Sequence, residues 1–390
     1  MVKPFQFSRL PLIYFGTGKI RVLPSLIRRY GNVVILVTDQ VSFTSSSYAT
    51  VLFESFRQEG IRYHHAVIQG EPSPDMIDTV VEKLRHEAVD AVVSIGGGSV
   101  LDAGKAISAM MCMPGSVREY LEVVGTREPP GKKLPFIALP TTSGTGSEAT
   151  KNAVISQTGK DGFKKSLRHD NFVPEIAIVD PELTISCPDN ITAASGMDCF
   201  TQLTESYLSD KACEYTDALA WEGLKAIKSS LVRSFINGQD AEARSGMSFA
   251  ALTSGICLAN AGLGVVHGFA SSIGGMFNIP HGAICGTLMA PANAISIREL
   301  GNRRSNPEAW NKYVRLGRLF LEAEGKSDNY YIDGFIEYLR ALSIDMKLPR
   351  LGQYGIRQSD LEPICRVTEL KNNPVKLDMI DLIEILKERL

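Results

Sequence analysis

Hydrophobic positions in the first half of the chain alternate between short apolar runs and segments with helical spacing. The apolar, β-branched runs predict buried strands at 32–39, 63–70, 88–99 and 134–142. The segments between them carry apolar residues three and four apart, which predicts helices at 44–59, 76–87 and 101–113. Strands that alternate with helices indicate right-handed crossovers and a mostly parallel, Rossmann-like sheet.

The pattern changes near residue 190, after which helical spacing dominates and strand-like runs are few. This spacing predicts helices at 191–209, 215–238, 241–264, 311–325 and 333–345. The segment 180–190 carries two prolines and an Asp-Asn pair, which interrupt regular structure. We therefore expect an α/β dinucleotide-binding domain over 1–187 and an all-helical domain over 188–390, with the active site in the cleft between them.

Composition narrows the classes of partner. The formal net charge is −2 and no long run of Lys or Arg occurs, so neither nucleic acid nor an anionic membrane is expected as a partner. No segment approaches the ~20 apolar residues of a membrane helix, and the start lacks a signal-peptide pattern. The seven cysteines are odd in number and form no CxxC pair, which is typical of free thiols in a reducing compartment. We expect a cytoplasmic protein.

A glycine-rich loop follows the third predicted strand, in the run SIGGGSVLDAGK. Glycines at the start of a helix let backbone N–H groups approach a phosphate closely, and the helix N-terminus adds partial positive charge. Asp102 lies in the first helical turn, where it would cap the helix or accept a ligand hydroxyl. The loop is neither GxGxxG nor a P-loop, so a plain tight turn is the alternative interpretation.

A second polar loop, TTSGTGSE at 141–148, follows the next predicted strand. Two such loops at neighbouring strand ends favour a dinucleotide or nucleotide. Asp39 ends the first predicted strand, where an acid accepts hydrogen bonds from the adenosine ribose and repels a 2′-phosphate. This predicts NAD rather than NADP, and the alternative role of Asp39 is a helix N-cap.

Two further stretches contain potential metal ligands. Asp198 and Gln202 are four residues apart, so on a helix they share one face. His267 and His281 are the only histidines in the second half of the chain, and a glycine follows each. One carboxylate and two imidazoles suit a divalent transition metal, and a glutamine stands where a stronger ligand is expected.

Together these motifs resemble the iron-containing (group III) alcohol dehydrogenases. The resemblance runs from PLIYFGTGKI onward and rests on GGGSVLDAGK, LPTTSGTGSE, VPEIAIVDPELT, GMDCFTQ and GLGVVHG…IPHG. It implies a dehydroquinate synthase-like fold, with a dinucleotide-binding domain followed by a helical one. It also implies NAD(P)-dependent interconversion of a small alcohol and its aldehyde or ketone at a divalent metal, in a homodimer or larger homo-oligomer.

The resemblance assigns the metal site residue by residue. Asp198, His267 and His281 match three family ligands for Fe²⁺ or Zn²⁺, and Gln202 occupies the position of a family histidine. Many members carry another histidine, implicated in proton relay, where this chain has Ser271. A proton would then travel through Ser271, a ribose hydroxyl or water.

The resemblance also assigns the cofactor and substrate residues. Asn152 matches a position near the nicotinamide and substrate, and the neighbouring Lys151 raises the alternative of an acidic substrate. The residues expected to bind the cofactor are Asp39, Gly97, Gly98, Ser99, Asp102, Thr141, Thr142, Thr145 and Lys164.

Gln202 leaves several interpretations open. Its amide oxygen is a weaker donor than imidazole, yet three protein ligands with an open position suffice in catalytic zinc sites. The leading interpretation is hydride transfer with a metal as Lewis acid. In the first alternative, the polar residues are vestigial and a metal-free reductase of the same fold acts on an acidic substrate. In the second, the chain is a catalytically inactive cofactor-binding paralogue.

Overall fold

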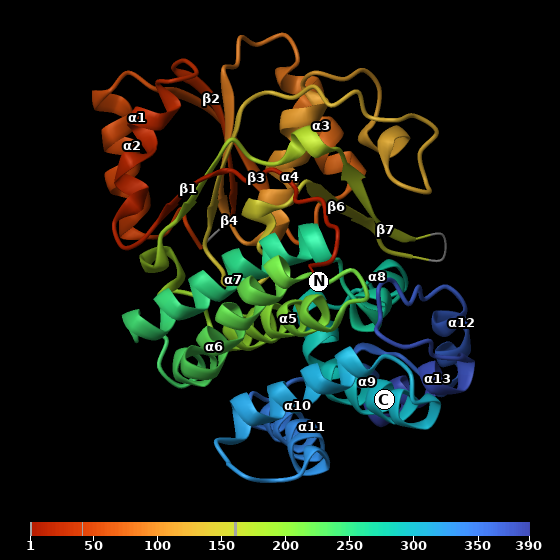
Figure 1. Cartoon of the computed structure of the whole chain (residues 1–390). Helices are drawn as coiled ribbons and strands as arrows, with labels where there is room; N and C mark the ends of the chain where they lie inside the picture. The colour runs from red at the N-terminus through yellow and green to blue at the C-terminus, as the bar shows by residue number, and fades with distance from the viewer. Residues whose placement is uncertain (1, 41, 160–161) are drawn as a thin grey trace.

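The computed structural model describes residues 2–40, 42–159 and 162–390. A parallel sheet flanked by helices forms one half, and a set of helices packed below it forms the other (Figure 1). The predicted α/β fold with a helical second half is confirmed. The expected domain boundary at 187/188 stays a prediction.

The main sheet has six parallel strands in the order β1-β8-β5-β4-β2-β3. All four predicted strands are present, and β1 and β8 are additional. The central strands are buried because helices cover both faces of the sheet, as β-branched runs of this kind require. The bounds are β1 (Leu12–Phe15), β2 (Val33–Asp39), β3 (Arg62–Ile68), β4 (Ala91–Gly96), β5 (Phe136–Pro140) and β8 (Ile176–Val179).

Alternate side chains of β2 belong to different hydrophobic cores, one on each face of the sheet. Val34 and Leu36 pack with one pair of helices, whereas Ile35 and Val37 pack with the other pair. Figure 1 shows the two pairs on opposite sides of the sheet. The first pair is α1 (Leu23–Ile27) and α2 (Ser47–Gln58), and the second is α3 (Pro74–Leu84) and α4 (Gly98–Met110).

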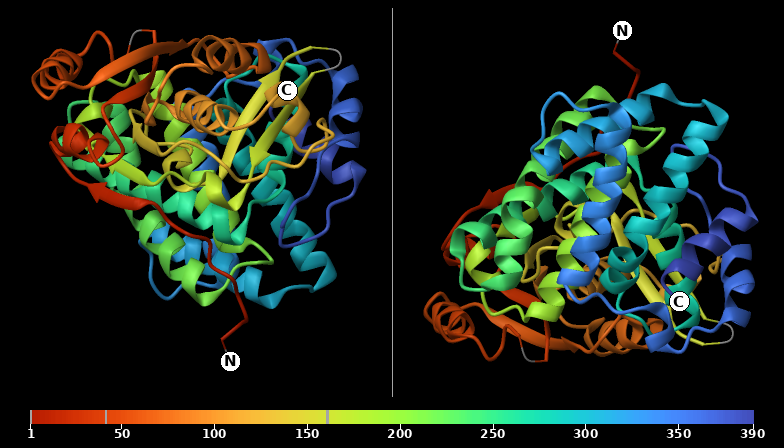
Figure 2. Two further views of the ribbon diagram at one scale, coloured as in Figure 1. Left: turned by 90° about the horizontal axis from the view of Figure 1, so that it is seen from above. Right: turned by 90° about the horizontal axis from the view of Figure 1, so that it is seen from below.

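A small antiparallel hairpin, β6 (Asn152–Gln157) and β7 (Phe163–Arg168), connects the two halves. The sequence pattern did not indicate these strands. The hairpin packs on α4 of the first half and on α8 (Val265–Met276) of the second. Both views of Figure 2 place the blue C-terminal segment beside it, where Lys165 Nζ lies 4.0 Å from a Glu369 carboxylate oxygen.

The second half is helical, and the five predicted helices are present within a few residues of their expected ends. Helix α5 lies at its centre and is buried over most of its length. The bounds are α5 (Asp189–Leu208), α6 (Glu214–Ile236), α7 (Ala241–Ala261), α8 (Val265–Met276), α9 (His281–Arg303), α10 (Pro307–Leu321), α11 (Asp328–Asp345), α12 (Leu361–Arg366) and α13 (Met379–Glu388).

Helices α8 and α9, which carry both site histidines, did not stand out in the sequence. Helix α8 is mostly apolar residues and glycine, so it lacks the polar face from which amphipathic spacing is recognised. Helix α9 contains Pro291, which removes one backbone hydrogen bond and usually ends a helix. Tertiary packing therefore determines both helices more than local pattern does.

The 141–148 loop presses directly on helix α7. Gly146 has φ +62°, and a Cβ on Gly255 would lie only 2.2 Å from the Gly146 carbonyl oxygen. Two glycines thus allow backbone-to-backbone contact between the carboxyl edge of the sheet and the helical half. This contact holds the predicted cofactor loop close to the helices that carry the predicted metal ligands.

Among the described residues, no single helix is both long and apolar enough to cross a membrane. In the same part of the chain, α7 and α8 taken together reach the required length and composition, but they are bent by 97° at their junction.

Candidate metal centre and cofactor site

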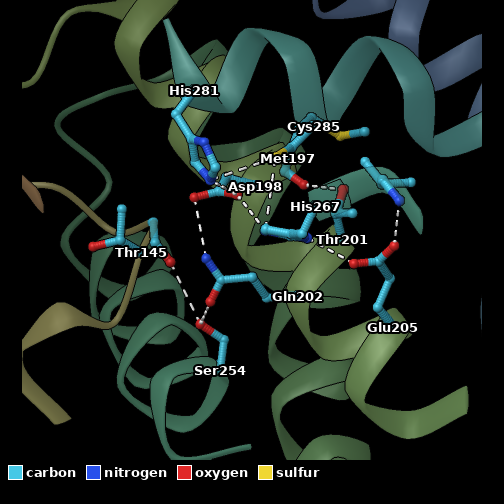
Figure 3. A network of polar contacts seen from close by, with 12 residues as sticks. Thr145, Met197, Asp198, Thr201, Gln202, Glu205, Ser254, His267, His281 and Cys285 are labelled. Carbon is cyan, nitrogen blue, oxygen red and sulfur yellow. Dashed lines mark hydrogen bonds and ion pairs between the residues drawn. The ribbon is translucent and has the colours of Figure 1, made fainter. Parts of the chain in front are cut away.

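Helix α5 presents Asp198 and Gln202 on one buried face, as their spacing predicted. Asp198 is 1% exposed and Gln202 is 2% exposed. A charged carboxylate is rarely buried to this extent without a partner, because leaving water costs it several kcal/mol. Its partners are the two histidines predicted with it, which arrive from α8 and α9 (Figure 3).

His267, in the first turn of α8, lies between two carboxylates. Its Nδ1 is 2.6 Å from Glu205 Oε2, and its Nε2 is 3.3 Å from Asp198 Oδ1. Glu205 also accepts a hydrogen bond from the backbone N–H of Val266 at 2.7 Å. Sequence reasoning missed Glu205, although it lies two turns beyond Asp198 on α5. A carboxylate behind a ligating histidine is a usual arrangement in metal sites.

His281 begins α9 and completes the predicted set. Its Nε2 is 3.7 Å from Asp198 Oδ1. Within the described part of the chain, its Nδ1 is buried without a hydrogen-bond partner. Two imidazoles and one carboxylate therefore converge, with Nε2 of each ring directed towards Asp198. The donor types and their convergence fit a divalent transition metal.

Cys285 is a fourth donor that sequence reasoning did not single out. It lies one turn after His281 on α9, and its Sγ is 3.7 Å from Nε2 of both His267 and His281. The potential ligand atoms of Asp198, His267, His281 and Cys285 all lie within 4.8 Å of one another. The 281/285 spacing is the same helical signal that linked residues 198 and 202.

Gln202 faces Asp198 through its amide nitrogen. Nε2 donates to Asp198 Oδ2 at 3.2 Å, and Oε1 accepts from the Ser254 hydroxyl at 3.2 Å (Figure 3). The same hydroxyl lies 3.4 Å from the carbonyl oxygen of Gly144, in the 141–148 loop. The shortest contact of the Ser254 hydroxyl is to the carbonyl oxygen of Ala251, at 2.8 Å. Gln202 and Ser254 thus lie between the Asp198 carboxylate and the 141–148 loop.

Charge at the cluster favours the metal-binding forms of two donors. Burial raises the pKa of Asp198, but His281 and His267 outweigh it and lower the pKa to about 2. Burial lowers the pKa of His281 to about 4, with a contribution from Lys164. Burial also lowers the pKa of His267, yet Cys285, Glu205 and Asp198 together raise it well above its ordinary value. At neutral pH Asp198 is ionised and His281 is neutral, as ligation requires.

Ser271 lies one turn beyond His267 on α8. Its hydroxyl donates to the carbonyl oxygen of His267 at 3.0 Å. The oxygen of Ser271 still has acceptor capacity, because a hydroxyl carries two lone pairs. The predicted role of Ser271 in proton transfer stays a prediction.

The two predicted phosphate-binding loops meet at the carboxyl edge of the sheet. Gly97 is the N-cap of α4, and its Cα faces Thr142, whose atoms lie 3.5 Å from where a Cβ would be. A Cβ on Gly98 would lie 2.6 Å from Thr145. Gly98, Ser99 and the helix N-terminus are thus next to the 141–148 loop, with no side chain on either glycine to block a diphosphate.

Asp39 ends β2, and its carboxylate accepts hydrogen bonds from the backbone N–H and the hydroxyl of Ser42. The interpretation of Asp39 as the helix N-cap is wrong. Helix α2 begins at Ser47, and Ser46 caps it by accepting from the backbone N–H of Ala49.

Both carboxylate oxygens of Asp102 accept hydrogen bonds from other parts of the chain. Its Oδ1 accepts from the Ser147 hydroxyl at 2.6 Å, and its Oδ2 accepts from the backbone N–H of Val154 at 3.1 Å. Lys105, which is fully buried, donates to the Ser147 hydroxyl and carbonyl at 3.0 and 2.9 Å. These contacts fasten α4 to the 141–148 loop and to the hairpin. The backbone N–H of Thr141 also donates a hydrogen bond to the Gly96 carbonyl oxygen at 2.9 Å.

The remaining predicted residues lie on or beside the hairpin. Lys164 on β7 forms an ion pair with Glu71 at 3.1 Å, close enough to His281 to affect its pKa. Lys151 is paired with Asp170 at 2.5 Å, so its charge is already matched. Asn152 Oδ1 accepts from Arg168 at 3.2 Å. Nothing here favours recognition of an acidic substrate by Lys151.

Comparison with known proteins agrees with this geometry. The family described as "Iron-containing alcohol dehydrogenase" matches residues 11–181, and "Fe-containing alcohol dehydrogenase family, C-terminal" matches residues 192–390. Long-chain-alcohol dehydrogenase 1 of Geobacillus thermodenitrificans is 34% identical over 359 residues, covering 91% of this chain and 88% of the relative. The NAD-dependent methanol dehydrogenase of Bacillus methanolicus is 32% identical, covering 97% of this chain and 98% of the relative.

The same fold occurs among solved structures. A 1,3-propanediol oxidoreductase crystal structure matches with a TM-score of 0.87 at 27% identity, and the match covers 100% of both chains. The sequence motifs, the fold and the relatives all support the same family assignment. The chain therefore belongs to the iron-containing alcohol dehydrogenase family and is an alcohol dehydrogenase of that type.

Proposed function

We propose that the enzyme interconverts a small alcohol and its aldehyde or ketone by hydride transfer with NAD(H), at a divalent metal held by Asp198, His267 and His281. The observation that supports this most strongly is the convergence of these three side chains from three helices. Burying a carboxylate among imidazoles is costly unless they share a cation or a proton. A divalent metal bound there would act as a Lewis acid on the substrate oxygen.

The protein's own groups hold and orient the reactants. The N-terminus of α4, with Gly97, Gly98 and Ser99, offers backbone N–H groups to the cofactor diphosphate. Asp39 accepts hydrogen bonds from the adenosine ribose. Ser271, one turn from His267, takes part in moving the hydroxyl proton between the substrate and solvent.

Activity should require an ionised carboxylate at residue 198. In metal-reconstituted enzyme assayed by NADH oxidation with a panel of short aldehydes and ketones, Asp198→Asn should lose about 100-fold or more in kcat/KM, since one charged ligand is removed. EDTA treatment should remove wild-type activity, and added metal should restore it.

The matched control is Asp345→Asn, which changes an exposed residue at the end of α11 and should retain full activity. Wild-type turnover that persists after complete metal removal would argue for a metal-free reductase. Tight NAD binding with no turnover on any substrate would argue for an inactive paralogue.

Asp39 should set the choice of dinucleotide. Asp39→Asn keeps the size of the side chain but removes the charge that repels a 2′-phosphate. The ratio of kcat/KM with NADPH to that with NADH should rise by roughly 10-fold or more. An unchanged ratio in steady-state assays of both cofactors would place the ribose elsewhere.

A further inference from the structure

The four donors around Asp198 have the spacing of a tetrahedral metal site. With metal–nitrogen and metal–oxygen distances near 2.0–2.1 Å and metal–sulfur near 2.3 Å, nitrogen–oxygen edges are about 3.3 Å and nitrogen–sulfur edges about 3.6 Å. Asp198 Oδ1 lies 3.3 Å from His267 Nε2 and 3.7 Å from His281 Nε2. Cys285 Sγ lies 3.7 Å from each of the two nitrogens. The sulfur thus occupies a vertex of the site.

Gln202 does not have this placement. An ionised carboxylate only accepts hydrogen bonds, so the amide atom 3.2 Å from Asp198 Oδ2 has to be the NH₂ group. The amide oxygen, which is the ligating atom of a glutamine, is then directed to the Ser254 hydroxyl. Turning the amide around would place its oxygen against the Asp198 carboxylate and would break that hydrogen bond.

The position of Cys285 on α9 brings its thiol beside the three other potential ligands. His281 and Cys285 are one turn apart on α9, as Asp198 and Gln202 are on α5. Cys285 is fully buried and lies on the side of α9 that faces α5 and α8. A thiol kept from solvent beside two imidazoles and a carboxylate has more polar neighbours than a cysteine that only fills a core.

We propose that Cys285, bound as a thiolate, is the fourth protein ligand of the metal in this enzyme, and that Gln202 is a positioning residue that orients Asp198. The proposal rests on the proposed function, in which Asp198, His267 and His281 hold a divalent metal. The fourth ligand would then come from α9, whereas the family position that Gln202 occupies lies on α5. Thiolate is a soft ligand, so this set favours zinc and cobalt over harder ions more strongly than one with three imidazoles does.

Cobalt substitution tests the ligand directly, without using activity. The metal-free enzyme is loaded with Co²⁺ while its stoichiometry is followed by calorimetry and its spectrum is recorded. One equivalent should bind and produce the intense near-ultraviolet band of thiolate-to-cobalt charge transfer. Bound Co²⁺ without this band would overturn the role of Cys285 but leave the proposed metal site standing. Absence of Co²⁺ binding would overturn both.

Variants assign the band to one sulfur. Cys285→Ser should lose the band and at least about 100-fold in Co²⁺ affinity, more than loss of an outer-shell group costs. The controls Cys112→Ser, exposed, and Cys257→Ser, buried, should keep both. In the double variant Gln202→His with Cys285→Ser, affinity should recover while the band stays absent. A Cys285→Ser variant that is folded by circular dichroism and retains wild-type affinity and the band would refute the proposal.

Discussion

At the scale of single residues, the carboxylate of Glu205 determines which nitrogen of His267 faces Asp198. It accepts from Nδ1 at 2.6 Å and from the backbone N–H of Val266 at 2.7 Å. With Nδ1–H donating to Glu205, a bound metal would displace the proton of Nε2 and take up its lone pair. The side chain therefore selects the ligating tautomer and the orientation of the ring.

Glu205→Gln should weaken metal binding without removing a ligand. The amide retains one hydrogen bond but loses the charge that makes imidazole a better donor, so the metal dissociation constant should rise by about 10–100-fold. Competition titration against a chromophoric chelator measures this. The surface variant Glu362→Gln, which only breaks an exposed pair with Arg366, serves as the control and should leave the constant unchanged. Equal affinities for all three proteins would show that Glu205 has a purely structural role.

Residue spacing was sufficient to find part of the site. Asp198 and Gln202 share a helix face, so their proximity follows from periodicity alone. Glu205 and Cys285 lie at helical spacings from predicted residues, but isolated acids and cysteines at such spacings are common. Only the packing of α8 and α9 against α5 shows that these two side chains join the cluster.

At the scale of elements, the contact between α7 and the 141–148 loop depends on glycine. A Cβ on Gly255 would meet the carbonyl oxygen, carbonyl carbon and Cα of Gly146 at 2.2 to 2.8 Å. All three are backbone atoms, which cannot rotate away as a side chain would. The elements themselves were predicted, but this contact was not, since a helical glycine carries no sign of what it touches.

Gly255→Ala should destabilise the protein despite the better helix propensity of alanine. Overpacking costs about 1–3 kcal/mol, more than the ~1 kcal/mol gained from propensity. Gly301→Ala is the matched control, because it is also helical and its Cβ would meet Trp310 only at 3.5 Å, so the free energy of unfolding should not fall. Urea denaturation of the three proteins measures the difference. A Gly255→Ala protein as stable as Gly301→Ala would contradict the close approach.

At the scale of the whole molecule, a buried acid lies where the two halves meet. Glu148 follows the Gly146 contact in the chain and is 2% exposed. Burial raises its pKa from 4.5 to about 7, although Lys105 nearby opposes the shift. The stabilising contribution of a group with a raised pKa is complete below its unfolded value and is lost as pH rises through the folded value. The neutral form of Glu148 is therefore favoured in the folded protein.

Glu148→Gln should make stability less dependent on pH. The wild type should lose free energy of unfolding relative to the variant as pH rises from 5 to 8, by about 2 kcal/mol. Urea unfolding of both proteins at the two pH values measures this difference. The comparison cancels contributions from groups that both proteins share. If the difference in free energy of unfolding between the two proteins is the same at both pH values, Glu148 does not titrate in this pH range.

The Ser254 hydroxyl lies between the predicted metal site and the predicted cofactor loop. It lies 3.4 Å from the Gly144 carbonyl oxygen and 3.2 Å from Gln202 Oε1, and the Gln202 amide nitrogen donates to the Asp198 carboxylate. A dinucleotide that shifts the loop would change the position of that carboxylate. Occupancy of one site should then alter the affinity of the other, and thermodynamic reciprocity requires the same factor in both directions. The affinity for a metal should therefore differ between the free enzyme and its complex with the dinucleotide.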